Sequence, residues 1–338
     1  MNIVFRVDSS NKMGTGHLMR CLTLADELKR QNHKVTFICR ILAGNLIDLI
    51  KQKSYKVINL PSDKSFQSNT LYLDWLSATQ GQDAQQTIQS MPDNIGLLVV
   101  DSYALDKEWH QKLRPLTKKI MVIDDLADRN FDCDMLLNQN LGSKEEDYQG
   151  KVPDDCQLLL GCKYALLRPE FSKLRDQALE KRKNTKEIKN ILVSMGCNNN
   201  ITYDILQQLD DRFNVVVVLG ESSPHNKIIQ NYAQGKNIKV IVKAKNMAEL
   251  MLAAELSIGA GGSTSWERCC LGLPTILYMT ADNQREVVKN LEQLGAVIIA
   301  KTLKDDLQVL MSNFGLWETM SERAQAICDG LGVKRIKI

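Results

Sequence analysis

The sequence predicts an α/β protein made of two Rossmann-like, doubly wound domains. Short β-branched runs alternate with helical patterns along the chain, and a highly charged stretch interrupts this alternation near the middle. The chain is 338 residues long, whereas one hydrophobic core rarely grows beyond about 250–300 residues. We therefore place a first domain at residues 1–172, a charged linker at 173–188 and a second domain at 189–338.

The first half contains five short apolar runs with the length and the β-branched content of buried parallel strands. These runs are Ile3–Val7, Val35–Cys39, Val57–Leu60, Leu97–Val100 and Ile120–Ile123. A polar segment, Ser62–Asn94, lies between the third run and the fourth. We expect this segment to be a decorated crossover with surface helices around Leu71–Leu76 and Ala84–Ile88, and to take no part in a site.

After residue 188 the strand pattern restarts and predicts a second doubly wound sheet. Its six runs are Ile191–Val193, Val215–Leu219, Ile238–Val242, Leu256–Ile258, Thr275–Tyr278 and Val297–Ile299.

The composition excludes several classes of function. The chain has 43 basic and 40 acidic side chains, a net charge of +3, which argues against a nucleic-acid or membrane surface. No apolar run approaches the roughly 18 residues of a membrane span, and the nine cysteines include no C-x-x-C pair. We therefore expect a cytoplasmic monomer that binds a small molecule and holds neither a metal nor a cofactor.

A glycine-rich turn follows the first predicted strand, in the order DSSNKMGTGH. Gly14 and Gly16 permit positive φ and close backbone approach, so the N–H groups at the helix start can face an anionic or polyhydroxylated ligand. The next residues predict a helix whose buried face carries Leu18, Cys21, Leu22, Ala25 and Leu28. The turn lacks the G-x-G-x-x-G spacing and the second strand ends without an acidic residue, which argues against a dinucleotide dehydrogenase.

His17 falls in the first turn of that helix, where the positive end of the helix dipole favours a neutral imidazole that can accept a proton. We therefore interpret His17 as a candidate general base. The alternative is that His17 only caps the helix or packs at the turn. Asp8 and Asp101 each follow or end a predicted strand on the same side, and they either orient the histidine, bind sugar groups, or act as ordinary strand-end caps.

A second glycine turn lies in LSIGAGGSTSWERCCLGLPTI, at residues 256–276. The backbone of Gly262 and the hydroxyls of Ser263 and Thr264 can bind a diphosphate, and Glu267 can accept hydrogen bonds from both ribose hydroxyls. The alternative is that Thr264-x-x-Glu267 is a capping box that would stabilise any helix start. Farther along, Asp282 has the position of an N-cap, and the amides of Asn283 and Gln284 are expected to point into the same cleft.

The combination of the two turns resembles the GT-B fold of inverting UDP-sugar enzymes. More specifically, FRVDSSNKMGTGHLMRCLTLA at 5–25 resembles the UDP-2,4-diacetamido-2,4,6-trideoxy-β-L-altropyranose hydrolases of pseudaminic acid biosynthesis. VVDSYALD at 99–106, DMLLNQNLG at 134–142 and YALLRPEF at 164–171 agree with that family. One departure concerns its G-G-x-D turn, which here reads Gly196-Cys197-Asn198-Asn199.

The resemblance implies two domains that face a central cleft, and metal-independent hydrolysis at C1 with inversion and loss of UDP. In such a reaction His17 activates the water, while Tyr103 and Asn283 contribute to the sugar site. The backbone near Met247 would read the uracil, and the stretch Leu303–Arg335 would cross back to the first domain. The rival functions are a GT-B glycosyltransferase, a non-hydrolysing UDP-sugar epimerase and a catalytically silent nucleotide-sugar sensor.

Overall fold

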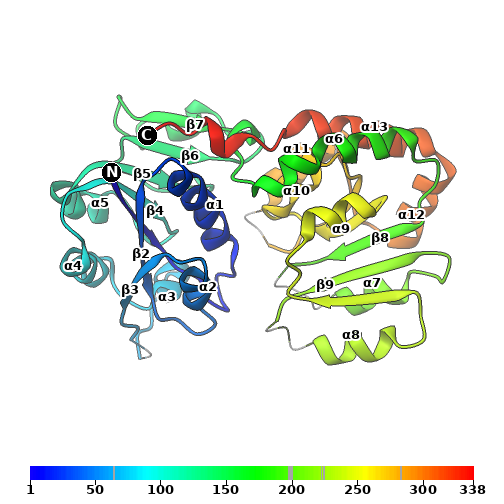
Figure 1. Ribbon diagram of the computed structural model, residues 1–338, viewed down its shortest axis with the longest axis horizontal. Coiled ribbons are helices and arrows are strands. Elements are labelled where there is room, and N and C mark those ends of the chain that lie inside the picture. The colour runs from blue at the N-terminus through cyan, green and yellow to red at the C-terminus, as the bar shows by residue number, and fades with distance from the viewer. Residues whose placement is uncertain (64, 197–200, 222, 224, 282–283) are drawn as a thin grey trace. The chain divides into compact units, whose positions relative to one another are not determined.

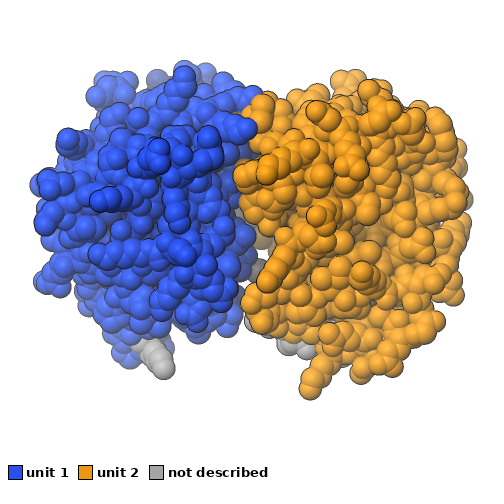
Figure 2. Space-filling model, viewed as in Figure 1, with its two compact units in different colours: residues 1–166, 333–338 blue, residues 167–332 orange. Residues whose placement is uncertain are grey.

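The computed structural model describes residues 1–63, 65–196, 201–221, 223, 225–281 and 284–338. The chain forms two compact units (Figure 2). Unit 1 comprises residues 1–166 and 333–338, and unit 2 comprises residues 167–332. No helix in the described ranges is long and apolar enough to cross a membrane.

Unit 1 is built on a seven-stranded parallel sheet with the order β3-β2-β1-β4-β5-β6-β7 (Figure 1). The strands are β1 (Asn2–Val7), β2 (Lys34–Arg40), β3 (Lys56–Leu60), β4 (Ile95–Asp101), β5 (Thr117–Ile123), β6 (Met135–Asn138) and β7 (Gln157–Leu160). The structure confirms the five strands predicted for this half and adds β6 and β7, which were not predicted. Because β1 pairs with both β2 and β4, the strand order changes direction there, which is where ligands bind in open α/β sheets.

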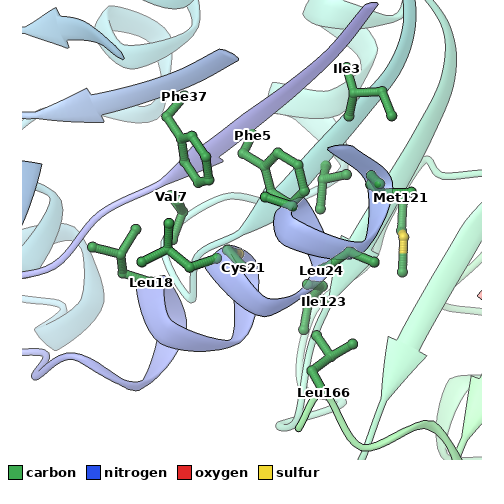
Figure 3. Close-up of a cluster of buried hydrophobic side chains, with 14 of the residues drawn as sticks. Ile3, Phe5, Val7, Leu18, Cys21, Leu24, Phe37, Met121, Ile123 and Leu166 are labelled. Atoms are coloured by element: carbon green, nitrogen blue, oxygen red, sulfur yellow. The ribbon is translucent and has the colours of Figure 1, made fainter. Parts of the chain in front are cut away.

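Helices cover both faces of this sheet. They are α1 (Gly16–Arg30), α2 (Ile47–Gln52), α3 (Leu71–Leu76), α4 (Gln80–Ser90) and α5 (Lys107–Leu113), with short 3₁₀ turns at Arg114–Leu116, Glu145–Tyr148 and Cys162–Tyr164. All five residues predicted for the buried face of α1 are buried. Leu18, Cys21 and Leu24 of this helix pack near Phe5 and Val7 of β1 (Figure 3).

The unit boundaries differ from the expected ones. The stretch expected to be a linker is most of helix α6 (Pro169–Asn184), which belongs to unit 2 and packs on three helices of that unit. Phe171, Ala178 and Arg182 are buried on one side of the helix, whereas charged residues such as Lys173, Glu180 and Lys183 are exposed. Only residues 333–338 rejoin unit 1, and not the longer stretch from Leu303.

Unit 2 contains a six-stranded parallel sheet with the order β10-β9-β8-β11-β12-β13. Its strands are β8 (Asn190–Ser194), β9 (Asn214–Leu219), β10 (Ile238–Val242), β11 (Leu256–Ala260), β12 (Thr275–Tyr278) and β13 (Val297–Ile299), which confirms all six predicted runs. Besides α6, its helices are α7 (Thr202–Gln207), α8 (Asn226–Ala233), α9 (Met247–Ala253), α10 (Thr264–Cys270), α11 (Arg285–Gln293), α12 (Leu303–Ser312) and α13 (Phe314–Ile327). A 3₁₀ turn at Gly332–Arg335 follows, and its residues from Val333 on belong to unit 1.

Candidate active site

The loop between β1 and α1 presents His17 at the second position of the helix. The Gly14 N–H donates a hydrogen bond to the Ser10 carbonyl (2.9 Å), and Gly14 has a φ of +77°, which only glycine adopts at low cost. Thr15, the N-cap residue, makes no side-chain capping bond, so the first N–H groups of α1 are left without that partner. Gly16 does not have the positive φ that the sequence suggested; a Cβ there would meet open space.

His17 is held by Asp101, the last residue of β4. The His17 Nδ1 lies 2.5 Å from Asp101 Oδ1. Burial alone would raise the pKa of Asp101, but the charges of Arg20 and His17 outweigh burial and hold this pKa well below its usual value. Asp101 is therefore a carboxylate that can only accept, so Nδ1 carries the proton that it donates. When the ring is neutral, this assignment leaves Nε2 with a free lone pair.

Arg20, one turn after His17 on α1, fixes the other side of the same carboxylate. Its Nε and Nη2 each donate a 2.7 Å hydrogen bond to Asp101, and its Nη1 donates to Asp125 at 3.1 Å. Burial lowers the pKa of Arg20, but Asp101 and Asp125 more than offset this effect. The Arg20 Nη2 also comes within 3.3 Å of His17 Nδ1, a close approach and not a donated bond because Nδ1 bears a proton.

Both Asp101 oxygens are therefore occupied by protein donors. The Cys21 thiol donates to Oδ2 at 3.4 Å, and the Asp101 side chain has no exposed surface. Of the alternatives considered for Asp101, this geometry supports orientation of the histidine, whereas direct binding of substrate would require one of these contacts to break.

Tyr103 lies directly against the imidazole. The two ring centroids are 4.5 Å apart with an interplanar angle of 78°, an edge-to-face contact. Burial and the nearby Asp125 carboxylate, to which the Tyr103 hydroxyl is hydrogen-bonded, raise the pKa of Tyr103. Arg129 donates a hydrogen bond to the Tyr103 carbonyl. The structure thus brings together His17, Asp101 and Tyr103, all of which the sequence singled out.

These residues border a recess of about 290 Å³ in unit 1, a volume that includes its open mouth. The lining residues are Asp8, Met13, His17, Tyr72, Trp75, Leu76, Asp101, Ser102, Tyr103 and Ala104. The expectation that Ser62–Asn94 takes no part in a site was wrong, because Tyr72, Trp75 and Leu76 come from that segment. The segment returns to the recess because α3 packs Leu76 into the core beside β4.

Among the described residues that line this recess, Asp8 is the acid with an unpaired carboxylate oxygen. Its Oδ1 accepts from the Arg40 N–H at 2.6 Å and lies 2.8 Å from Arg6 Nη1. Its Oδ2 is buried and has no hydrogen-bond partner among the described residues. A buried carboxylate oxygen without a partner is costly, and a substrate hydroxyl or a water would satisfy it.

In unit 2 the second glycine turn leads into α10. Ser263, and not Thr264, is the N-cap residue of α10, so the capping box that was the alternative for Thr264 and Glu267 is not formed. The Ser263 side chain makes no capping bond either. Arg168 Nη2 donates to one Glu267 oxygen at 3.2 Å. Burial raises the pKa of Glu267 despite that arginine.

Two further predicted residues of unit 2, Gln284 and Met247, lie at helix starts. Gln284 Oε1 accepts from the Thr280 hydroxyl at 3.2 Å, and its amide lies beside Gly262. Met247 is the first residue of α9. Asn283, Asp282 and the Cys197–Asn199 turn lie outside the described residues. No group of three potential metal ligands occurs in the part of the chain that the structure describes.

Sequence reasoning missed Arg20 and Asp125. A signal was available for each. Arg20 stands three residues after His17 and therefore shares its helix face. Asp125 follows shortly after β5, which lies next to β4, so its side chain reaches the same sheet edge.

The two parallel-sheet units define the class of the protein as GT-B. MurG of Acinetobacter baumannii superposes with a TM-score of 0.66 over 98% of this chain and 97% of that chain, at 16% identity. The UDP-GlcNAc 2-epimerase of Neisseria meningitidis, solved with UDP-GlcNAc bound, gives a TM-score of 0.65 over 99% and 98% of the two chains, at 14% identity. At such identities the likeness concerns the fold alone.

Sequence relatives narrow this class. Residues 170–310 match the glycosyltransferase family 28 C-terminal domain. The chain is 30% identical over 255 residues to the UDP-2,4-diacetamido-2,4,6-trideoxy-beta-L-altropyranose hydrolase of Campylobacter jejuni, which covers 74% of this chain and 81% of that protein. It is 23% identical to the spore coat polysaccharide biosynthesis protein SpsG of Bacillus subtilis, over 99% and 96% of the two chains.

An uncharacterized protein of Methanocaldococcus jannaschii is 28% identical over 297 residues, and this chain spans only 57% of its length. The matches to the Campylobacter hydrolase, to SpsG and to the family 28 domain together show that the chain belongs to a family of UDP-sugar-related GT-B proteins, which includes that hydrolase.

Proposed function

We propose that this protein hydrolyses a UDP-sugar at the anomeric carbon with inversion, and that the donor is UDP-2,4-diacetamido-2,4,6-trideoxy-β-L-altropyranose. The products would be UDP and the free 2,4-diacetamido-2,4,6-trideoxy-L-altrose, a precursor of pseudaminic acid. The observation that carries the proposal is the His17–Asp101 contact of 2.5 Å beside an open recess. The 30% identical Campylobacter relative supports the choice of donor.

In the proposed reaction Nε2 of His17 takes a proton from a water molecule as the water oxygen bonds to C1. The bond between C1 and the diphosphate oxygen breaks, and its electron pair leaves with UDP. The imidazolium that forms keeps its Nδ1–H directed at Asp101, which stays ionised and stabilises the new positive charge. General-base catalysis of this kind contributes about 10²–10⁴ in rate.

Other residues would have supporting roles. The free Oδ2 of Asp8 can accept from the attacking water or from a sugar hydroxyl. In unit 2, the Ser263 and Thr264 hydroxyls and the backbone of Gly262 would bind the diphosphate, while Glu267 would bind the ribose. The absence of a capping bond from Ser263 supports this assignment, because its hydroxyl is not engaged by the helix.

The match to the glycosyltransferase family 28 domain favours a second candidate, a transferase in which an acceptor hydroxyl replaces water. The same His17 would serve both reactions. The distinction is whether UDP is released when no acceptor is present.

The test is UDP release from the proposed donor without any acceptor, compared for wild type, His17→Ala and His33→Ala. His33 is the matched control because it follows α1 and lies outside the recess. Hydrolysis predicts rapid release that only His17→Ala reduces, by about 10²–10⁴, while UDP binding measured by calorimetry persists. Release that requires an added acceptor would support the transferase, and no release with tight donor binding would support a sensor.

Isotope labelling locates the broken bond. In water enriched in ¹⁸O, attack at C1 places the label in the sugar, whereas attack at phosphorus places it in UDP. Label found in UDP would contradict the proposed mechanism even if His17 is essential.

A further inference from the structure

The recess beside His17 is lined by two chemically different sets of side chains. Four lining residues are polar: Asp8, His17, Asp101 and Ser102. The other six present rings or alkyl groups: Met13, Tyr72, Trp75, Leu76, Tyr103 and Ala104. Five of the ten are buried, so the surface open to a ligand comes from Met13, His17, Tyr72, Trp75 and Ser102. These five include both hydrogen-bonding and apolar groups, as small-molecule sites commonly require.

Four of these side chains form an aromatic row, which we define as Trp75, Tyr72, Tyr103 and His17. Their ring centroids lie 5.2 Å apart between Trp75 and Tyr72, 5.1 Å between Tyr72 and Tyr103, and 4.5 Å between Tyr103 and His17. All three separations are within the range of favourable aromatic contacts. The row is thus packed, and its inner end is the candidate general base.

Helix α3 supplies the outer part of the row. Leu76 on this helix is 1% exposed and anchors it in the core. Tyr72 and Trp75, three residues apart and so on one helix face, remain half-buried. Large aromatic surfaces that stay partly open inside a recess are typical of ligand contacts.

An ion pair also joins α3 to the loop that carries the histidine. Lys12 Nζ lies 2.6 Å from Asp74 Oδ2, and Asp74 stands between Tyr72 and Trp75 in the sequence. An exposed pair of this kind contributes at most about 1 kcal/mol, so the apolar anchor at Leu76 holds α3 and the pair only aligns it. The aromatic row is therefore positioned relative to His17 by two independent contacts.

We propose that Tyr72 and Trp75 determine substrate specificity by binding the C6 methyl group of a 6-deoxy sugar. This inference rests on the proposed function, which places the sugar beside His17. A C6 hydroxyl packed against the faces of these rings, out of reach of the Tyr72 hydroxyl and the Trp75 indole N–H, would lose its hydrogen bonds to water without gaining equivalent partners, whereas a methyl group would not. An acetamido group suits this surface less well, because its N–H and C=O both need partners.

The experiment compares two donors that differ only at C6: UDP-2,4-diacetamido-2,4,6-trideoxy-β-L-altropyranose and its 6-hydroxy analogue. Wild type is expected to favour the 6-deoxy donor in kcat/KM by about 10–200-fold, the range for one small apolar group in a fitted pocket. Tyr72→Ala and Trp75→Ala should lower kcat/KM for the 6-deoxy donor and bring the ratio of the two donors towards one. Most of the change should be in KM.

Three controls separate specificity from folding. Tyr72→Phe and Trp75→Phe keep an apolar ring and should retain the preference, while Tyr232→Ala removes a half-buried aromatic of α8, in unit 2. Melting temperatures of all variants show whether each variant keeps the stability of the wild type. If both alanine variants lose kcat/KM equally for the two donors, so that the ratio of the two values stays as in wild type, the proposal is overturned.

Equilibrium binding keeps the two proposals distinguishable. If wild type releases UDP from neither donor, the proposed hydrolysis fails, and calorimetric titration of both donors into wild type and the alanine variants then tests the aromatic row alone. A preference for the 6-deoxy donor that both alanine variants abolish would support the row as a specificity determinant. Equal affinity of wild type for the two donors would refute it.

Discussion

Replacing Asp101 by Asn tests how the site makes His17 a base. The substitution keeps the shape of the side chain but removes a negative charge 2.5 Å from Nδ1. Two of the donors around Asp101 belong to Arg20. All the partners of Asp101 donate, so the amide NH₂ faces a donor in either orientation. With the amide oxygen towards His17 Nδ1 and Arg20 Nη2, the histidine tautomer survives, whereas the hydrogen bond from Arg20 Nε and the negative charge are both lost.

The expected loss follows from the charge. Two unit charges about 4 Å apart interact by about 4 kcal/mol at the effective dielectric constant of a protein site, and each 1.36 kcal/mol is a factor of ten in rate. The imidazolium formed in the transition state loses this stabilisation and still faces Arg20. We therefore expect kcat to fall by about 10³, with KM within a few-fold of wild type because Asp101 is buried behind His17.

The assay is steady-state UDP release at saturating donor, with Asp48→Asn as a matched control, since Asp48 is 89% exposed and pairs only weakly with Lys51. Removing one partner of a buried ion pair costs about 3–5 kcal/mol of stability, so rates are compared below the melting temperature of each variant. A kcat within tenfold of wild type would refute the reasoning. The His17→Ala/Asp101→Asn double variant gives a second test. If its kcat falls by the product of the two single effects, the reasoning is also refuted, because the effects of residues that act as one unit are not additive.

Two further predictions concern stability. Gly14→Ala should lower the free energy of unfolding by about 1–2 kcal/mol because Gly14 has a φ of +77°. Gly16→Ala should change it by less than about 0.5 kcal/mol because the added Cβ would meet open space. Urea denaturation of the two variants checks this prediction, and equal effects would contradict it. Burial lowers the pKa of His110 to about 3, below its value of about 6.5 in the unfolded chain. The contribution of neutral His110 to folding stability is therefore fully present above pH 6.5 and is lost as the pH falls towards 3. Wild type should lose about 2 kcal/mol between pH 7 and pH 5 through this group, and His110→Gln should show a correspondingly shallower decline in urea titrations at the two pH values.

The parallel strands could be predicted from sequence because their burial on both faces leaves continuous apolar runs. This rule located eleven strands but not β6 and β7, whose sequences MLLN and QLLL contain no β-branched residue. Leucine runs of this length do not distinguish a strand from a helix or a loop, and the pairing of β6 with β5 and β7 is set by contacts distant in sequence. The charge of α6 similarly concealed the few apolar residues that bury one of its faces.

The site could be predicted in part. His17 was identifiable because the glycine turn and the following helix are local features. Its partners Asp101 and Arg20 are brought together by the pairing of β1 with β4, in which Val7 lies opposite Asp101. The contribution of Tyr72 and Trp75 could not be predicted, since a polar segment gives no indication of which of its few aromatics turn inwards. That depends on how Leu76 packs in the core.

The return of residues 333–338 to unit 1 affects when the His17 site can be completed during synthesis. Val333 and Ile336 are buried in the same apolar cluster as Leu18 of α1, yet they are translated about 170 residues after Leu166. At 5–20 residues per second, this delay is roughly 10–30 s. Most of unit 1 therefore leaves the ribosome first, but its core is completed only when the last residues of the chain are made. A fragment of residues 1–166 would lack the core side chains of Val333 and Ile336.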